Sequence, residues 1–362
     1  YALVLVQAHQ ERGWEMKKAV VVTVGSPKES LGAMKLSHYL ARNGYEVTER
    51  TKVGIEDRYD LYCFSVIFSW RLREMVQMVR EVSHQGEVWI GGPAVTFHPA
   101  NAAFVERETG IRPTTGIDER FEREAGDFPM VYFSRGCPAY TPACGICPVP
   151  KIEGNAFRYY PDSQPAKLLL DNNLSALPAE YQDHIIKTYA DKWSGGRVDA
   201  NSGFEPHTFN EKTLLRWKKF PLMFWRFGYD DTTERDQALE MLALLKFHGY
   251  TGDKVRIYTM IGNEDKATSH RRIREVVEGG AFPWPQRVRP LDWLGPDGTL
   301  PTRHDWDEDT LTAFQRFYSL PQLWRKFLKE GTSPDEFFYQ GRYPLRIEAK
   351  PPSRGGEGGS HE

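Results

Sequence analysis

Apolar runs alternate with amphipathic segments along the first third of the chain. The run 19–24 is continuously apolar and mostly β-branched, which is typical of a strand buried on both faces of a parallel sheet. Apolar residues at helical spacing follow it, with Gly44 just beyond their end. The same alternation predicts strands at 46–51, 60–69 and 88–90, and helices at 31–45 and 71–84. Residues 16–125 therefore predict a Rossmann-like, doubly wound α/β domain with its ligand crevice at the carboxyl ends of the strands.

A second series of apolar segments begins after residue 126, and most of them end in polar residues. We expect strands at 131–133, 167–178, 196–206, the start of 221–250, 254–265 and 286–293, with a strong amphipathic helix in the rest of 221–250. Polar groups at the carboxyl ends of such strands are where α/β enzymes place their active sites. The pattern predicts a second α/β domain over 126–295, followed by an aromatic-rich helical appendage over 296–345.

Composition narrows the class of protein. The chain has 362 residues, 40% of them hydrophobic, and a net charge of −2, which suits two domains with sizeable cores and argues against a strongly basic nucleic-acid protein. Apolar runs stay well short of 18 residues, so we expect no membrane span and a cytoplasmic protein. Residues 1–15 lack signal-peptide features and read as a non-native extension before Met16, and 346–362 read as a disordered tail.

Three of the four cysteines fall within eleven residues. Cys137, Cys144 and Cys147 lie on one loop after the strand at 131–133, whereas Cys63 lies inside an apolar strand and reads as a core thiol. Three thiolates can hold three irons of a 4Fe–4S cluster and leave the fourth iron open. A structural zinc site would need a fourth ligand, which His98 or His184 could supply. The sequence favours iron–sulfur and leaves zinc open.

The run SRGCP…CGIC resembles the cluster loop of the radical S-adenosylmethionine (SAM) superfamily. Cys144 to Cys147 fit the second half of that pattern, with Ile146 in the position that packs near the adenine. The first half departs from it, because six residues rather than three separate Cys137 from Cys144. The resemblance implies a partial (β/α)6 barrel over 126–295, in which the three cysteines hold the cluster and SAM binds the open iron.

The same resemblance assigns further residues to SAM. Asp171, Asn172 and Asn173 stand where the superfamily holds the amino group of the methionine moiety. The segment GYDDTTER resembles the ribose-side turn and places Asp230 and Asp231 near the ribose, and MIGNED resembles the adenine-side motif through Ile261 and Gly262. Each has a plainer interpretation, because Asp and Asn are common helix caps and a glycine can simply form a turn.

The N-terminal domain is similar to the cobalamin-binding-type domain that precedes many radical enzymes, through DLYCFSVIFSW and WIGGPAVTF. That family's usual Asp-x-His-x-x-Gly signature is missing. The sequence therefore favours a degenerate Rossmann-like domain that shapes a substrate pocket, with cobalamin as the less favoured alternative.

These observations predict a radical SAM enzyme, an oxidoreductase or transferase. The resemblance implies that its 4Fe–4S cluster cleaves SAM reductively and that the resulting 5′-deoxyadenosyl radical abstracts hydrogen from a substrate. It also implies an electron donor such as flavodoxin or ferredoxin. The sequence leaves the substrate open, nucleic acid included; Arg287, Arg289 and His304 are candidates to meet an anionic group on it. The alternative is a non-catalytic, cysteine-ligated zinc or iron–sulfur binding module on an α/β scaffold.

Overall fold

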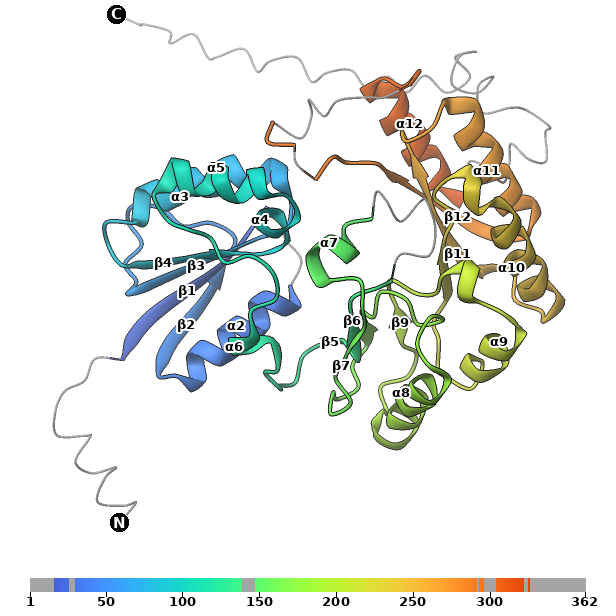
Figure 1. The fold of residues 1–362 in the computed structure, drawn as a ribbon, viewed down its shortest axis with the longest axis horizontal. Coiled ribbons are helices and arrows are strands. Elements are labelled where there is room, and N and C mark those ends of the chain that lie inside the picture. Colours follow the sequence, from blue (N-terminus) through green and yellow to red (C-terminus); the bar gives the residue numbers. More distant parts are fainter. Residues whose placement is uncertain are drawn as a thin grey trace, which may run out of the picture.

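Two α/β regions lie side by side in the computed structural model (Figure 1). It describes residues 16–25, 30–138, 147–291, 293–295, 304–321 and 325. The predictions for 1–15 and 346–362, those for Cys144 and Ile146, and much of the predicted appendage lie outside these residues. What the structure describes is a mixed α/β protein built on parallel sheets, as the sequence predicted.

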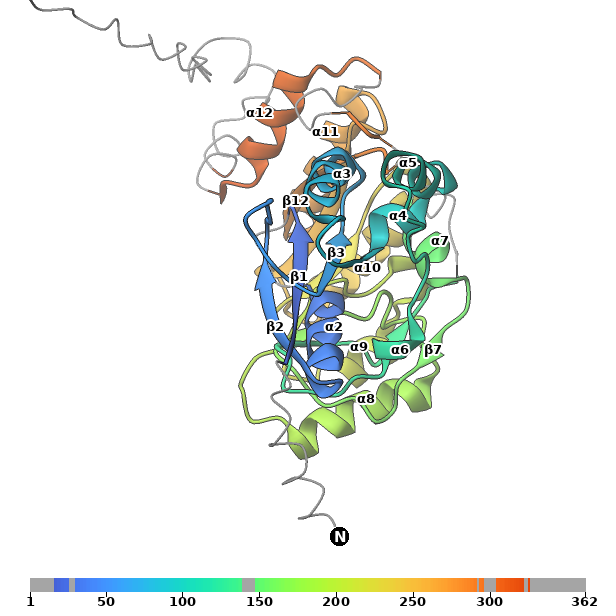
Figure 2. The ribbon, with the colours of Figure 1, turned by 90° about the vertical axis from the view of Figure 1, so that its left-hand side faces the viewer.

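The first region is a four-stranded parallel sheet in the order β2-β1-β3-β4. Figure 2 shows it from the side, in front of the second region. The chain passes from β1 to β2 on one side of the sheet and then crosses over β1 to β3 on its other side. The strand order therefore reverses between β1 and β3, as in doubly wound folds. The strands are β1 (Lys17–Val24), β2 (Tyr45–Arg50), β3 (Leu61–Val66) and β4 (Glu87–Gly91).

Helices cover both faces of this sheet. One face packs on α2 (Leu31–Arg42), and Cys63 lies fully buried there, so the prediction of a core thiol is confirmed. The opposite face packs on α3 (Leu72–Val82) and α5 (Pro99–Thr109). Shorter elements complete the region: η1 (Ser69–Arg71), α4 (Pro93–Phe97) and α6 (Glu119–Glu122).

The second region places six parallel strands in chain order. One set pairs as β5-β8-β9 and the other as β10-β11-β12. Parallel bridges from Val198 to Leu222 and from Phe204 to Phe227 connect the two sets. The strands are β5 (Met130–Val131), β8 (Leu168–Leu169), β9 (Asp199–Ala200), β10 (Trp225–Gly228), β11 (Gly252–Ile261) and β12 (Ala281–Arg287). Each strand therefore neighbours its predecessor, as repeated β-α units require.

Helices flank these strands and share a large aromatic core with them. Trp217 and Phe227, from a helix and a strand, are both fully buried in it. The helices are α8 (Ala179–Lys192), α9 (Glu211–Trp217), α10 (Arg235–Phe247), α11 (Lys266–Glu278) and α12 (Glu308–Tyr318). The connections also hold β6 (Ser134–Arg135), which pairs antiparallel with β7 (Arg158–Tyr159), and α7 (Val149–Glu153), η3 (Pro206–Thr208) and η4 (Thr232–Glu234).

The predicted sixth strand is wrong in its bounds. The sequence placed it at 286–293, but β12 runs from Ala281 to Arg287. Two prolines, Pro283 and Pro285, interrupt the segment and hide its strand character. They are tolerated because β12 ends the β10-β11-β12 order, and an edge strand can leave alternate positions without a ladder hydrogen bond.

Part of the predicted appendage is present as α12, which packs on β12 through Phe282, Leu311 and Phe314. Among the helices in the described ranges, none is both long enough and apolar enough to cross a membrane.

Candidate functional site

A cavity of about 1450 Å³ lies between the two regions. From the first region it is lined by the carboxyl ends of β3 and β4, including Ser65 and Gly91, and by the start of α2. From the second region it is lined by residues on all six strands or directly after them. Gly92 allows the tight turn after β4: its φ is +107°, and a Cβ there would lie 2.6 Å from the carbonyl oxygen of Val66. The carboxyl ends of parallel strands usually bind ligands, and in this protein those ends of both regions border the same cavity.

A buried ionic network holds β6, the strand that leads into the cysteine loop, against the neighbouring helices. Arg135 in β6 donates to Glu153 of α7 at 2.8 Å and to Glu122 of α6 at 2.9 Å. Burial lowers the pKa of Arg135, but these two carboxylates outweigh it and raise the pKa overall. Burial likewise opposes the charge on Glu153, and Arg135 more than compensates, so the pKa of Glu153 lies below its usual value. Both groups are therefore charged.

Glu153 also contacts the loop itself. Its other carboxylate oxygen accepts hydrogen bonds from the backbone N–H of Gly136 at 2.9 Å and from the Asn172 amide at 2.7 Å. Gly136 has a φ of +84°, and a Cβ there would lie 2.3 Å from the carbonyl oxygen of Ala156. The backbone N–H of Cys137 donates to the carbonyl of Gly154 at 3.3 Å. These contacts bind the chain entering the loop to the helix that follows it.

The two described cysteines of the loop lie beside the cavity. Cys147 lines it, directly before α7, and the sulfur of Cys137 accepts a hydrogen bond from the Asn173 amide at 3.8 Å. Cys144 lies outside the described residues. Within the described ranges, which lack Cys144, no three His, Cys, Asp or Glu side chains come close enough to hold a metal ion.

The two histidines considered as a fourth zinc ligand lie elsewhere. His98 caps α5 by accepting from the backbone N–H of Ala100, and His184 on α8 bonds to the carbonyl of Pro161. Neither side chain is among the described groups that line the cavity.

The three consecutive residues after β8 have different surroundings. Asp171 is fully buried, and its carboxylate accepts from the backbone N–H of Phe133 at 3.0 Å and from the hydroxyl of Ser134 at 2.6 Å. Burial outweighs these hydrogen bonds and raises the pKa of Asp171 to about 7. Asn172 lines the cavity, whereas the Asn173 oxygen accepts from Ser175 and the backbone N–H of Ala176. Asn172 is thus the one of the three that a ligand in the cavity would meet.

Carboxyl groups gather where β10 ends. Asp230 lines the cavity, and burial followed by the nearby Glu234 raises its pKa to about 7. Glu205, which also lines the cavity, has a pKa raised to about 8 by the same two causes in the same order. Asp231, by contrast, caps η4 by accepting from the backbone N–H of Thr233 at 2.7 Å. The two adjacent aspartates therefore have different environments, one facing the cavity and one capping a helix.

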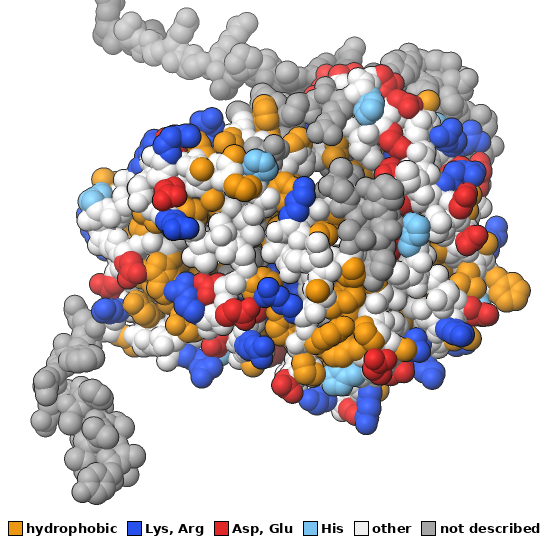
Figure 3. All heavy atoms as spheres, viewed as in Figure 1, with side chains coloured by type: hydrophobic (Ala, Val, Ile, Leu, Met, Phe, Trp, Pro, Cys, Tyr) orange, Lys and Arg blue, Asp and Glu red, His pale blue; other side chains and the backbone are white. Residues whose placement is uncertain are grey.

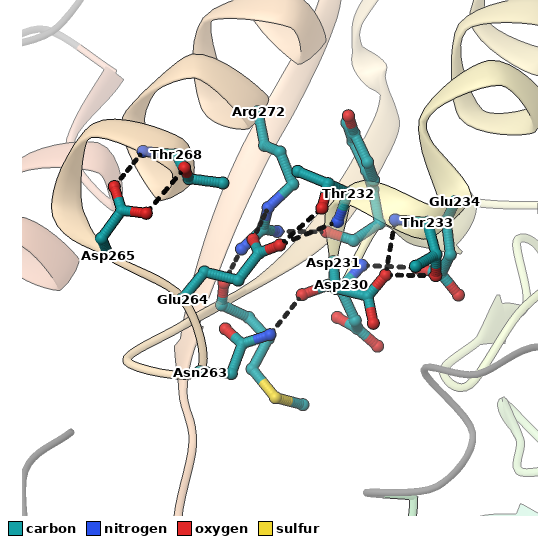
Figure 4. Close-up of polar contacts among 12 residues, drawn as sticks. Asp230, Asp231, Thr232, Thr233, Glu234, Asn263, Glu264, Asp265, Thr268 and Arg272 are labelled. Carbon is teal, nitrogen blue, oxygen red and sulfur yellow. Dashed lines mark hydrogen bonds and ion pairs between the residues drawn. The ribbon is translucent and has the colours of Figure 1, made fainter. Parts of the chain in front are cut away.

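Glu264 joins the two segments that the sequence linked to ribose and adenine. It accepts from the backbone N–H and hydroxyl of Thr232, at 3.0 and 2.9 Å, and from Arg272 at 2.8 Å (Figure 4). Arg272 is fully buried and also donates to the backbone carbonyls of Tyr229 and Met260. Figure 4 shows Thr232, Glu264 and Arg272 pointing toward one another. Thr232 follows β10, Glu264 follows β11 and Arg272 lies on α11. The predicted Ile261 is buried against α12, and Gly262 has a φ of +87° beside Leu311.

The residues proposed to meet an anionic group are engaged in other contacts. Arg287 forms a two-pronged ion pair with Glu308 of α12, and His304 contacts the carbonyl of Asn263 at 2.8 Å. The Arg289 guanidinium lies 4.9 Å from the centre of the Trp70 ring. None of the three lines the cavity as the described residues define it.

Sequence reasoning missed several side chains that lie on the strands of the second region. Asp199, Arg226, Arg256, Tyr258 and Trp284 all line the cavity. In β11 every second residue is buried on the helix side, so 256, 258 and 260 face the opposite side. That alternation was the signal available in the sequence. The outer surface differs from this lining: Figure 3 shows basic and acidic side chains interspersed over the face drawn.

No protein-family model matches this chain, and no curated protein matches it. The candidate site therefore rests on its own geometry.

Proposed function

We propose that this chain is a radical SAM enzyme whose 4Fe–4S cluster is held by Cys137, Cys144 and Cys147. The observation that carries the proposal is the position of the segment that leads into the cysteine loop. This segment follows the first of six parallel strands in chain order and borders the 1450 Å³ cavity at their carboxyl ends.

The described donor groups fit such a cluster. Cys147 lines the cavity and Cys137 is half-buried beside it, and thiolates are the usual ligands of iron–sulfur clusters. The Asn173 amide donates to the Cys137 sulfur, and hydrogen bonds to ligand sulfurs tune such sites. The Arg135–Glu153 pair connects the chain before the cysteine loop to the chain after it, so both ends of the loop are held in place.

The remaining cavity groups suit SAM. When bound, the reduced cluster and SAM together supply reductive cleavage of the sulfonium bond and hydrogen-atom abstraction from the substrate. Glu205 and Asp230 present carboxyl groups that can accept hydrogen bonds from amino and hydroxyl groups. Phe204 and Met260 contribute apolar surface to the same wall, which helps exclude water. A cytoplasmic setting and a flavodoxin- or ferredoxin-type electron donor belong to the proposal, with a bound corrin as its less favoured alternative.

The test is anaerobic reconstitution of the full chain with iron and sulfide, followed by electron paramagnetic resonance of the reduced protein with and without SAM. We expect a cluster signal that changes when SAM is added, because SAM would bind an open iron. A colourless protein with stoichiometric zinc would contradict the proposal and favour a binding module.

A further inference from the structure

Two arginines face each other across neighbouring strands inside the cavity. Arg226 of β10 and Arg256 of β11 are direct register partners, and both line the cavity. Like charges directly opposite one another in a sheet are destabilising unless a counter-charge is present. Within the described residues, one carboxylate forms an ion pair with either of these two guanidinium groups.

That carboxylate belongs to Asp199 and is taken by Arg226. Arg226 donates to its two oxygens at 2.7 and 2.6 Å and also to the hydroxyl of Tyr258 at 2.5 Å. This is the two-pronged geometry in which guanidinium and carboxylate bind best. Both oxygens of Asp199 thus bind Arg226, and within the described residues Asp199 forms no hydrogen bond with Arg256.

Arg256 has aromatic neighbours instead. Its guanidinium carbon lies 3.4 Å from the centre of the Phe224 ring and 6.0 Å from that of Trp284. Across the described residues, Arg256 makes no hydrogen bond or ion pair with a side chain or backbone carbonyl. Burial, and then the charge of Arg226, lower its pKa more than the carboxylates of Asp199 and Asp253 raise it, and Asp253 is itself paired with Arg325. Trp284 is 36% exposed and lines the same cavity.

We propose that Arg256 anchors an oxyanion, a carboxylate or a phosphate, on the substrate of this enzyme, with Trp284, which also lines the cavity, contacting the apolar part next to it. This inference rests on the proposed function, because it takes the molecule in the cavity to be the substrate of the enzyme. It adds the chemical class of that substrate. Other cationic side chains also line the cavity, but each of them is already paired with a carboxylate: Lys35, Arg120, Arg135 and Arg226. Arg256 therefore provides the favourable place for an anion. It replaces Arg287, whose guanidinium is already paired with Glu308.

The test uses the full chain before any cluster is reconstituted, so its result is independent of the radical chemistry. Benzoate and phenyl phosphate are titrated by calorimetry, and benzyl alcohol serves as the uncharged probe. We expect one of the anions to bind with one-to-one stoichiometry and benzyl alcohol to bind far more weakly. Preference for benzoate would indicate a carboxylate substrate, and preference for phenyl phosphate a phosphorylated one.

Variants assign the binding to this residue. Arg256→Gln should weaken binding at least about tenfold, the loss expected for a charge-assisted contact. Arg256→Lys should have an affinity between the two, because it keeps the charge but loses the planar guanidinium. This variant also controls for a folding defect in Arg256→Gln. Arg274→Gln, on the exposed face of α11, should bind like the unmodified chain. Equal binding by Arg256→Gln, or no binding of either anion by the unmodified chain up to about 10 mM, would overturn the proposal.

Discussion

The guanidinium of Arg135 and the carboxylate of Glu153, 2.8 Å apart, connect the strand before the cysteine loop to the helix after it. Both side chains are largely buried, so this contact is shielded from solvent far better than a surface ion pair. The stem of the loop is thus fixed by residues that lie outside the cysteine motif.

Replacing Glu153 by Gln should destabilise the protein by about 2 kcal/mol, because it removes charge-assisted hydrogen bonds to Arg135 and Gly136. It should also reduce the iron bound on reconstitution. Urea unfolding and iron analysis measure the two effects. Glu278→Gln, an exposed pair partner on α11, is the control. Unchanged stability and iron content in Glu153→Gln would show that the stem does not depend on this pair.

Alanine at Cys137, Cys144 or Cys147 should each abolish assembly of a stable cluster, because a three-thiolate site cannot lose a ligand without exposing a second iron. Cys63→Ala should keep the iron content, since that thiol is buried between β3 and α2 and its pKa is raised to about 12 by burial. Iron and sulfide analysis after reconstitution decides the matter. Full iron in Cys137→Ala would remove that cysteine from the ligand set and point to an unusual loop.

Glu205 should make stability depend on pH. Its usual pKa of 4.5 is raised to about 8 in the native state, so the native protein keeps a proton that the unfolded chain releases. The free energy of unfolding therefore falls as pH rises through this window, by up to about 1.4 kcal/mol per unit. Asp230 and Asp171, with pKa values of about 7, act in the same direction, and their contribution fades over the unit above pH 7.

In the interval from pH 7 to 8, Glu205 makes the largest of these three contributions. We expect urea midpoints of the unmodified chain to decrease across it and those of Glu205→Gln to decrease clearly less. Asp236→Asn, an exposed carboxylate on α10, should retain the original decrease. If Glu205→Gln shows the same decrease, another group must carry the proton.

Arg272→Met should cost about 3 kcal/mol or more, because it leaves the Glu264 carboxylate and two backbone carbonyls without their buried donor. Urea unfolding measures the loss. Arg272→Lys should be milder, since an ammonium can satisfy part of this set. Arg271→Met, at the neighbouring exposed position of the same helix, should leave stability nearly unchanged. A small loss in Arg272→Met would mean that the ends of β10 and β11 are held together by packing alone.

The first region was predictable because its strands carry long β-branched runs. Residues 19–24 and 61–66 are buried on both sides by helices, and the sequence shows it directly. Strands β5, β8 and β9 have only two paired residues each, so their positions could be predicted from the polar residues that follow but their bounds could not. In β12, prolines masked a strand whose edge position was not visible from the sequence.

The site was predictable only at the level of segments. Asp230 and Asp231 are adjacent and chemically alike, yet one faces the cavity and the other caps a helix. Sequence cannot separate them, because the backbone direction at the turn decides which side chain points inward. Arg256 was missed for a related reason: its lack of a partner follows from Asp199, 57 positions away, being held by Arg226.

The cavity walls belong to the hydrophobic cores of both regions, which are separate from each other. A molecule that fills the space would touch both, and its binding free energy would then be available only while both are folded. Saturation with such a molecule would merge the melting of the two halves into a single cooperative transition, with the ligand acting as a noncovalent cross-link.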